Sequence, residues 1–346
     1  MASSFRRVML VFAAAVLTAC GQPAGAPLAG TAAAQKARAL SVERAAAIDR
    51  AVAPHTALKA TKDNEARLLV DGAEGFGAIR DLILGAKKSL WFETFIWHND
   101  QTGVKVAQLL RQRALEGLDV RVLIDMAGSR NREDDKHVLR ILQDYQVPVR
   151  YFNPYITKGA NFHISHRKLY MADGYRAITG GMNIGAEYET EWHDLLVEVR
   201  GSAARQMHQG FIDGWNNSND GPPEQLVIPD PPATPTSGTV TARLALTSLP
   251  PRKPRREEIK HAHFAAIRAA QKRIRMFPIY LSDPDYVEEL AKAARRGVEI
   301  QLLIPTKNDF ESFRYINRHY AGRLLDAGAT VKVYDKLFSH VKYLSI

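Results

Sequence analysis

The sequence of 346 residues contains a single cysteine, Cys20, so no disulfide can form within the chain. No segment is both apolar and long enough for a transmembrane helix. No group of His, Cys, Asp and Glu residues has the spacing of metal ligands, so we expect neither a metal nor another cofactor. The hydrophobic fraction of 46% and the charged fraction of 24% are those of a globular protein, and the length allows two domains with cores of their own.

Positive charge predominates. Lysine and arginine number 47 against 37 acidic residues, which gives a net charge of +10. A basic surface suits an anionic partner, either anionic lipid or nucleic acid. Charge alone is equally compatible with a basic protein that binds neither.

The N-terminus has the layout of a secretory signal: Arg6 and Arg7 precede an apolar run over residues 8–19 that is too short to span a bilayer. The run ends in Leu-Thr-Ala-Cys-Gly at residues 17–21, which resembles the lipobox of bacterial lipoproteins. The resemblance implies a signal peptide over 1–19 and a diacylated Cys20. The Ala, Gly and Pro content of the next segment predicts a tether over 20–64, with one possible helix near residues 34–52. The alternative is an ordinary signal peptide with an incidental cysteine.

The residues after the lipobox cysteine bear on the location. Gly21 and Gln22 lack the aspartate that retains many such lipoproteins at the inner membrane. We therefore expect a lipid anchor in a bacterial cell envelope, on the periplasmic side and at the outer membrane rather than the inner.

The rest of the chain repeats one pattern. Strand-like runs at 89–97, 119–125 and 147–152 alternate with helical patterns at 103–116 and 133–145. The same order returns at 273–281, 284–296, 298–304, 311–327 and 330–334. Alternation of this kind predicts an α/β fold in which each of two duplicated lobes has a mixed, largely parallel sheet flanked by helices. We place the first lobe at 65–218, a linker rich in Pro, Asp and Gly at 219–238, and the second lobe at 239–346.

Each copy of the repeated pattern is followed by a His-x-Lys pair. His166 and Lys168 lie in the first copy, and His340 and Lys342 lie at the same place in the second. Residues two apart in a strand point to one face, so each pair projects together. A surface strand can carry one such pair by chance, but two pairs at equivalent ends of a duplication indicate one bipartite site.

The first copy continues to Asp173, which completes the pattern H-x-K-x-x-x-x-D, and this resembles the signature of the phospholipase D superfamily. Residues 180–185 (Gly-Gly-Met-Asn-Ile-Gly) and 192–194 (Trp-His-Asp) are similar to the G-G-x-N-x-G and W-x-D of its cardiolipin synthase branch, as are Glu93 and the Gly-Ser pair at 128–129. The resemblance implies the phospholipase D fold, with a pseudo-twofold site in a monomer.

The chemistry of these residues agrees with that resemblance. Phosphodiester exchange needs a nucleophile, a proton donor for the leaving oxygen, and positive charge around the phosphoryl oxygens. Imidazole can supply the first two near neutral pH, and lysine supplies the charge without a metal. We expect His166 to attack phosphorus and His340 to act as the acid and base, although the symmetry leaves the assignment open. Lys168, Lys342 and Asn183 would hold the phosphoryl oxygens.

Other roles come from the resemblance alone. It implies that Asp194 orients His166 by a hydrogen bond, that Asp173 belongs to the catalytic motif with a mainly structural part, and that Glu93, Gly180 and Gly181 lie at the substrate. Glu93 can also be read as a buried strand carboxylate with a structural partner.

The leading hypothesis for the reaction is phosphatidyl transfer from an anionic phospholipid, phosphatidylglycerol, to an alcohol. Hydrolysis by water, giving phosphatidic acid, is the first alternative. A nuclease is the second, against which a lipid anchor counts, so we do not expect nucleic acid as the partner. The third is an inactive lipid-binding fragment.

The second motif reaches only Ile346, directly before the position where its aspartate belongs. We therefore expect that the second lobe is truncated here, that the intact gene encodes Asp next, and that the carboxylate orienting His340 lies further on. A chain ending at this point should be impaired in stability and activity.

Overall fold

A computed structural model describes residues 15–16, 32–129, 135–152, 164–218, 220–231, 238–248 and 256–346. The expected lipidation site Cys20 lies outside these residues. Within them, no helix is both apolar enough and long enough to cross a membrane.

The described residues of the first lobe form α-helices and β-strands in the alternating order that the sequence predicts. They are β2 (Thr61–Val70), α2 (Asp71–Gly85), β3 (Ser89–Thr94), α3 (Gln101–Leu115), β4 (Asp119–Asp125), α4 (Met126–Ser129), α5 (Asp135–Gln143), β5 (Val149–Phe152), β6 (Leu169–Ala172), β7 (Arg176–Gly180), α6 (Ala186–Thr190), β8 (Leu195–Arg200) and α7 (Ser202–Asn216).

The sheet of the first lobe runs in the order β1-β9-β2-β8-β7-β6-β3-β4-β5, where β1 is Ala15–Val16 and β9 is Val240–Leu244. Only β3 with β4 and β4 with β5 are parallel, whereas β6, β7, β8, β2 and β9 pair antiparallel. The expectation of a largely parallel sheet is therefore wrong for this lobe, whose sheet is mixed. The cause is local: β6 and β7 are joined by a tight turn with Asp173 and Gly174 at φ values of 55° and 75°, and a turn that short forces antiparallel pairing.

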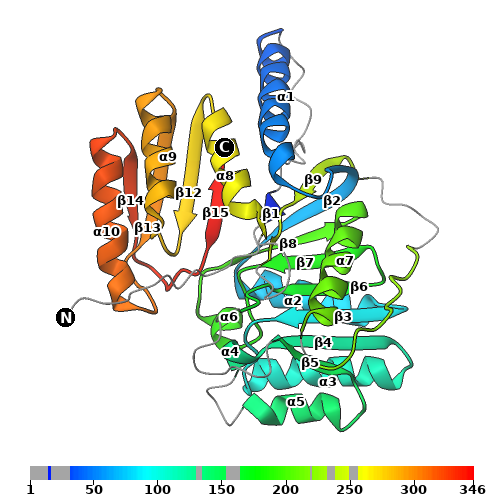
Figure 1. Cartoon of the computed structure of the whole chain (residues 1–346). Helices are drawn as coiled ribbons and strands as arrows, with labels where there is room; N and C mark the ends of the chain where they lie inside the picture. The colour runs from blue at the N-terminus through cyan, green and yellow to red at the C-terminus, as the bar shows by residue number, and fades with distance from the viewer. Residues whose placement is uncertain are drawn as a thin grey trace.

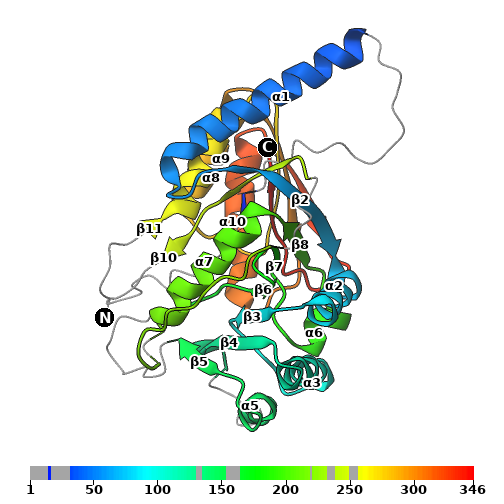
Figure 2. The ribbon, with the colours of Figure 1, turned by 90° about the vertical axis from the view of Figure 1, so that its right-hand side faces the viewer.

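Helices cover both faces of this sheet (Figures 1 and 2). Side chains alternate along β3, so that Leu90 and Phe92 join one core cluster with α2, α3 and α5, while Trp91 joins the other with α7. All six residues of β3 are buried. β3, which pairs with the strand that follows the first motif, is thus packed against helices on both faces.

The second lobe repeats the first in shorter form. It contains β10 (Thr247–Ser248), β11 (Arg256–Glu257), α8 (Glu258–Ala269), β12 (Arg273–Pro278), α9 (Pro284–Arg295), β13 (Glu299–Pro305), α10 (Glu311–Asp326), β14 (Thr330–Tyr334) and β15 (Lys342–Ser345). Its four-stranded sheet runs β14-β13-β12-β15, with only the β12–β15 pair antiparallel. Gly117 and Gly297 occupy the equivalent turns before β4 and β13 at φ values of 92° and 87°, a conformation that glycine adopts readily.

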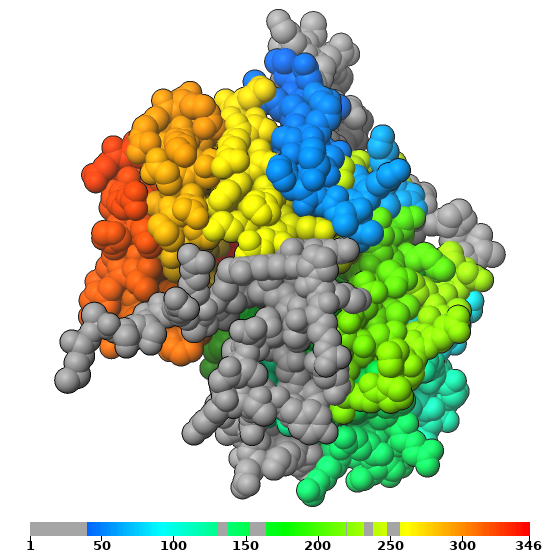
Figure 3. Space-filling view, viewed as in Figure 1, coloured from blue at the N-terminus to red at the C-terminus, as the bar shows by residue number. Residues whose placement is uncertain are grey.

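The lobes are linked more closely than the expected boundaries imply. Residues 240–244 fall in the range expected for the second lobe, yet they form β9, which pairs with β2 and so covers an edge of the first sheet. The helix expected near residues 34–52 is α1 (Ala32–Val52), followed by a short 3-10 helix, Ala53–His55. Ile48 and Val52 of α1 pack against α8 in one apolar cluster. Figure 3 shows α1 in blue beside the yellow surface of α8 and above the green first lobe, with the orange part of the second lobe on the other side of the yellow surface.

Candidate active site

Both His-x-Lys pairs lie at the start of a strand that pairs antiparallel with the first of the three parallel strands in their lobe. His166 and Lys168 lead into β6, which pairs with β3, and His340 and Lys342 lead into β15, which pairs in the same way with β12. Within each pair the lysine folds back onto its histidine. Lys168 Nζ lies 3.0 Å from His166 Nδ1 and donates to the His166 carbonyl at 3.0 Å. Lys342 Nζ lies 2.9 Å from His340 Nδ1 and donates to the His340 carbonyl at 2.7 Å.

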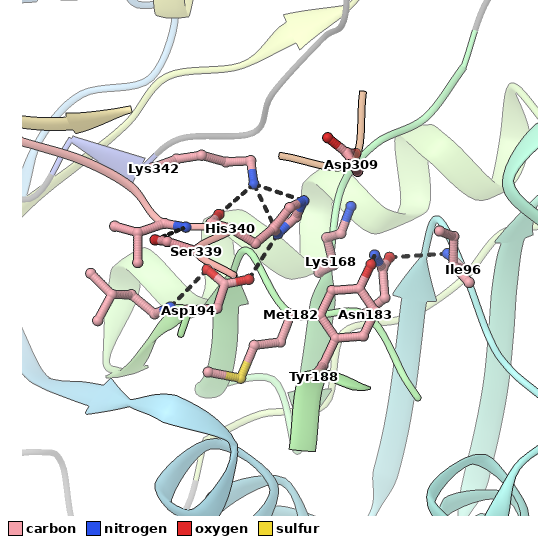
Figure 4. Close-up of polar contacts among 12 residues, drawn as sticks. Ile96, Lys168, Met182, Asn183, Tyr188, Asp194, Asp309, Ser339, His340 and Lys342 are labelled. Carbon is pink, nitrogen blue, oxygen red and sulfur yellow. Dashed lines mark hydrogen bonds and ion pairs between the residues drawn. The ribbon is translucent and has the colours of Figure 1, made fainter. Parts of the chain in front are cut away.

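The two pairs meet at the junction between the lobes. His193 N–H donates to the carbonyl of Phe338 at 2.9 Å, and His340 N–H donates to the carbonyl of His193 at 2.9 Å. The rings of Trp192 and Phe338 lie 4.4 Å apart across the same junction. Lys168 from the first lobe and the His340 side chain from the second point into one shared space (Figure 4). The structure thus brings the predicted bipartite site together.

Asp194, in the first lobe, contacts the histidine of the second lobe. Its Oδ2 accepts a hydrogen bond from His340 Nδ1 at 2.9 Å, and its Oδ1 accepts from the Leu195 N–H at 2.8 Å. The expectation that Asp194 orients His166 is therefore wrong, and so is the expectation that the partner of His340 lies beyond Ile346. The physical reason is the backbone pairing of residues 193 and 340, which sets the wholly buried Asp194 beside His340.

Burial lowers the pKa values of all four motif residues, and like charge adds to this effect for His166, Lys168 and His340. Removal from water, then the charges of Lys168 and Lys342, hold the pKa of His166 well below its usual value. Burial and Lys342 lower the pKa of His340 to about 4, against the opposing effect of Asp194. Burial lowers the pKa of Lys342 to about 8 and that of Lys168 well below the ordinary lysine value. Both imidazoles are consequently neutral at pH 7, and a phosphodiester anion placed between the ammonium groups would raise all four values.

Asn183 lies beside the site with its amide tied to the protein. Its Oδ1 accepts from the Ile96 N–H at 3.0 Å, and its Nδ2 donates to the Tyr188 hydroxyl at 2.7 Å (Figure 4). The Tyr188 ring lies 5.7 Å from the His340 ring, edge to face. Asn183 therefore connects the end of β3 with the aromatic wall around His340, and one amide hydrogen remains for a substrate oxygen.

Gly180 and Gly181 allow β7 to approach the carboxylate. A Cβ on Gly181 would lie 2.1 Å from Asp194 Oδ1, and Gly180 has a φ of 152° against the Leu195 carbonyl. These contacts give the two glycines a packing role next to Asp194. That both glycines lie at the substrate, as the resemblance implies, stays a prediction. Their close approach to Asp194 and Leu195 is a separate reason for glycine at these positions.

Asp173 and Glu93 lie behind the histidines. Asp173 stands at the far end of β6, where its carboxylate accepts hydrogen bonds from the N–H groups of Lys87, Lys88 and Ser89. These bonds give Asp173 a structural role, in agreement with the mainly structural part that the resemblance implies, and they keep its carboxylate away from the reacting groups. Glu93 is 1% exposed and accepts hydrogen bonds from the Ser165 hydroxyl at 2.6 Å and from Arg167 Nε at 3.0 Å. These contacts favour the alternative in which Glu93 is a buried strand carboxylate with structural partners.

Two groups near the site were not among the predicted residues. Asp125, the last residue of β4, accepts the N–H of Ser165, directly before His166. Asp71 accepts from His193 Nδ1 at 2.6 Å and so supports the segment that carries Asp194. A carboxylate at the end of a buried parallel strand could have pointed to Asp125, whereas no sequence signal joins Asp71 to His193. Within the described ranges, no group of three or more His, Cys, Asp or Glu residues could hold a metal ion.

Comparison with known proteins agrees with this geometry. The profile of the family described as "Cardiolipin synthase, PLD-like domain" matches residues 79–215 and 264–346. A cardiolipin synthase of Listeria welshimeri is 32% identical over 297 residues, which is 83% of this chain and 60% of that protein. Cardiolipin synthase 2 of Bacillus anthracis is 32% identical over 304 residues, covering 84% of this chain and 57% of that one. The chain thus spans about 60% of the length of the curated relatives it matches.

Among solved structures, a phosphatidylserine synthase of Haemophilus influenzae has a TM-score of 0.60 at 15% identity, over 86% of this chain and 80% of that one. At this identity the similarity establishes the fold alone. It agrees with the fold expected from the duplicated motif.

Proposed function

Because the chain belongs to the phospholipase D-like family of cardiolipin synthases, we propose that it transfers phosphatidyl groups between alcohols through a phosphohistidine. The observation that carries the proposal is the convergence of two His-x-Lys pairs, with Asp194 of the first lobe hydrogen-bonded to His340 of the second. The carboxylate stabilises the protonated form of the His340 imidazole, which suits this histidine to the role of acid and base.

The first step forms a phosphorus–nitrogen bond. A neutral ring nitrogen of His166 attacks phosphorus, and the bond from phosphorus to the leaving glycerol oxygen breaks. His340, protonated when the anionic substrate is bound, gives its proton to that oxygen. The low pKa of His166 suits attack, because a protonated imidazole has no lone pair to donate.

The second step reverses the roles. Neutral His340 takes the proton of an incoming hydroxyl, whose oxygen bonds to phosphorus while the phosphorus–nitrogen bond to His166 breaks. Asp194 fixes the His340 tautomer and stabilises the imidazolium that forms. Lys168 and Lys342 supply fixed positive charge to the non-bridging oxygens in both steps.

Phosphatidylglycerol is the proposed donor, since the net charge of +10 suits an anionic lipid and a second phosphatidylglycerol offers a hydroxyl as acceptor. Incubation of the chain with radiolabelled phosphatidylglycerol in detergent micelles tests this, with a His166→Ala blank. Labelled cardiolipin that declines when excess glycerol is added is the expected result. Phosphatidic acid as the sole product would show that water is the acceptor. No product and no labelled protein would overturn the proposal.

The location is a separate proposal. We infer that Cys20 carries a lipid anchor that holds a monomeric enzyme at the periplasmic side of the envelope, at the outer membrane. The support is the sequence at residues 17–21 and the Gly-Gln pair after it. An anchor would keep the site close to a phospholipid substrate.

A further inference from the structure

The two lobes differ directly behind their histidines. Glu93 in β3 and Phe277 in β12 occupy the same register, each opposite the residue three places after the histidine of its motif. Asp125 and Pro305 likewise end β4 and β13, each six places after the equivalent first residue of its strand. Two carboxylates in the first lobe thus correspond to two apolar residues in the second. The pseudo-twofold symmetry of the motifs does not extend to this layer.

Asp125 uses its carboxylate to join two segments. Its Oδ2 accepts the N–H of Ser165 at 2.5 Å, and its Oδ1 accepts the N–H groups of Ala127 and Gly128 at 2.8 Å and 3.3 Å. The side chain is 1% exposed. One carboxylate therefore ties the turn after β4 to the residue directly before His166. A buried carboxylate that accepts three backbone hydrogen bonds holds its neighbours strongly, because charge-assisted hydrogen bonds are stronger than neutral ones.

Glu93 holds both neighbours of the same histidine through their side chains. Its Oε1 accepts from the Ser165 hydroxyl at 2.6 Å and from Arg167 Nε at 3.0 Å, while its Oε2 is buried without a hydrogen-bond partner in the described part of the chain. In the second lobe, Ser339 and Val341 stand at these positions. His340 has instead the direct bond to Asp194.

We propose that Asp125 is a positioning residue for His166, acting in its ionised form through the backbone of Ser165. The inference rests on the proposed attack of His166 on phosphorus. It assigns to the first histidine a carboxylate restraint that acts through the backbone, whereas Asp194 contacts the ring of His340 directly. A nucleophile needs its ring aimed at phosphorus more than it needs a fixed positive charge, and a tie to the preceding backbone supplies that aim.

The pKa of the Asp125 carboxyl lies close to neutral pH. Burial raises its pKa to about 7, against the lowering effects of the three N–H groups and of Lys168. Among the described residues, the charged group that acts on Asp125 is Lys168, on the segment before β6. Phe152, its partner on β5, and the residues of α4 carry no charge.

Asp125→Asn tests the inference, because asparagine keeps one oxygen for the turn after β4 but places an NH₂ group against the Ser165 N–H. Asp119→Asn, at the exposed end of the same strand, is the matched control. Phosphoenzyme formation from radiolabelled phosphatidylglycerol is followed by rapid quench. We expect about 10²-fold slower labelling in Asp125→Asn with little change in KM, the scale of a nucleophile displaced by about 1 Å, and wild-type labelling in the control.

A second measurement needs no variant. In the wild-type protein, the amide proton of Ser165 should shift with pH around a midpoint near 7, and the labelling rate should rise over the same interval as Asp125 ionises. Equal labelling rates in wild type and Asp125→Asn, or a Ser165 amide that titrates while the labelling rate does not follow it, would overturn the inference alone. Absence of labelled protein in the wild type would overturn the proposed function and this inference with it.

Discussion

Asp194 of the first lobe accepts a hydrogen bond at 2.9 Å from Nδ1 of His340 in the second lobe. The bond crosses the junction between the lobes, where the backbone of His193 both donates to and accepts from residues 338–340. His340, the proposed acid and base, is consequently oriented by a residue of the other lobe. Each lobe alone would hold an incomplete site.

Asp194→Asn should therefore impair the enzyme severely while the fold remains. An asparagine can present its NH₂ group to His340 and so favour the wrong tautomer. In a serine protease, the corresponding change costs about 10⁴-fold in kcat, and we expect a loss approaching that size. Steady-state assays with circular dichroism check it, with the exposed Asp213→Asn as control. A kcat within a few-fold of wild type would show that the Asp194–His340 bond does not matter to catalysis.

Gly181→Ala should weaken the same Asp194–His340 hydrogen bond, because Gly181 packs against the Asp194 carboxylate. The added Cβ would lie 2.1 Å from Asp194 Oδ1 and must displace the carboxylate. Gly77→Ala in α2 is the control, because nothing lies within 4 Å of its Cβ. It should leave activity unchanged and stabilise the fold by about 0.4–1 kcal/mol. Activity and thermal unfolding separate the two, and equal activity in both variants would contradict the account.

Much of the architecture could be predicted from the sequence because it is local. The strand at 119–125 and the strand at 330–334 were expected with the bounds they have, and the helix at 284–296 ends one residue earlier, at Arg295. Hydrophobic periodicity and the glycines at 117 and 297 carry this information. The duplicated His-x-Lys pairs likewise predicted one shared site.

The remainder depends on contacts between distant segments. Nothing near Asp194 in the sequence shows which histidine it meets, since the pairing of residues 193 and 340 decides that. β9 joins the first sheet because β2 offers an edge, although β9 follows the linker in sequence. The hydrogen bond from Ser165 to Asp125 could not be predicted for a similar reason, because the two residues lie 40 positions apart in the sequence. Hydrophobic periodicity shows which face of a helix or strand is buried, but it does not show which distant segment packs against that face.

The alkaline side of the pH profile should reflect Lys342. Burial depresses its pKa to about 8, so its positive charge is present below that pH and is lost above it. We expect kcat/KM, which reports the free enzyme, to fall as the pH rises through about 8, and kcat to fall only at higher pH, because bound phosphate favours the charged lysine. Lys342→Arg should lose the kcat/KM decline, since arginine stays protonated. An unchanged decline in that variant would assign it to another group.

The location can be tested by Cys20→Ser. A diacylated cysteine would supply the main hydrophobic attachment, so the variant should move from the membrane fraction to the soluble fraction. Washing with high salt controls for attraction between the basic protein and anionic lipid, which salt screens. Retention of the variant in washed membranes would refute the lipid anchor.

The central claim is that the two histidines divide the reaction, with a covalent bond on His166 and proton transfer by His340. The direct measurement is trapping of the phosphoenzyme from radiolabelled phosphatidylglycerol by a denaturing quench at alkaline pH, followed by peptide mapping. We expect an acid-labile label at His166 in the wild type, no label and no turnover in His166→Ala, and label that persists in His340→Ala because no base activates the acceptor. A His166→Ala enzyme that turns over at a near-normal rate, or label found on His340 instead, would contradict the account.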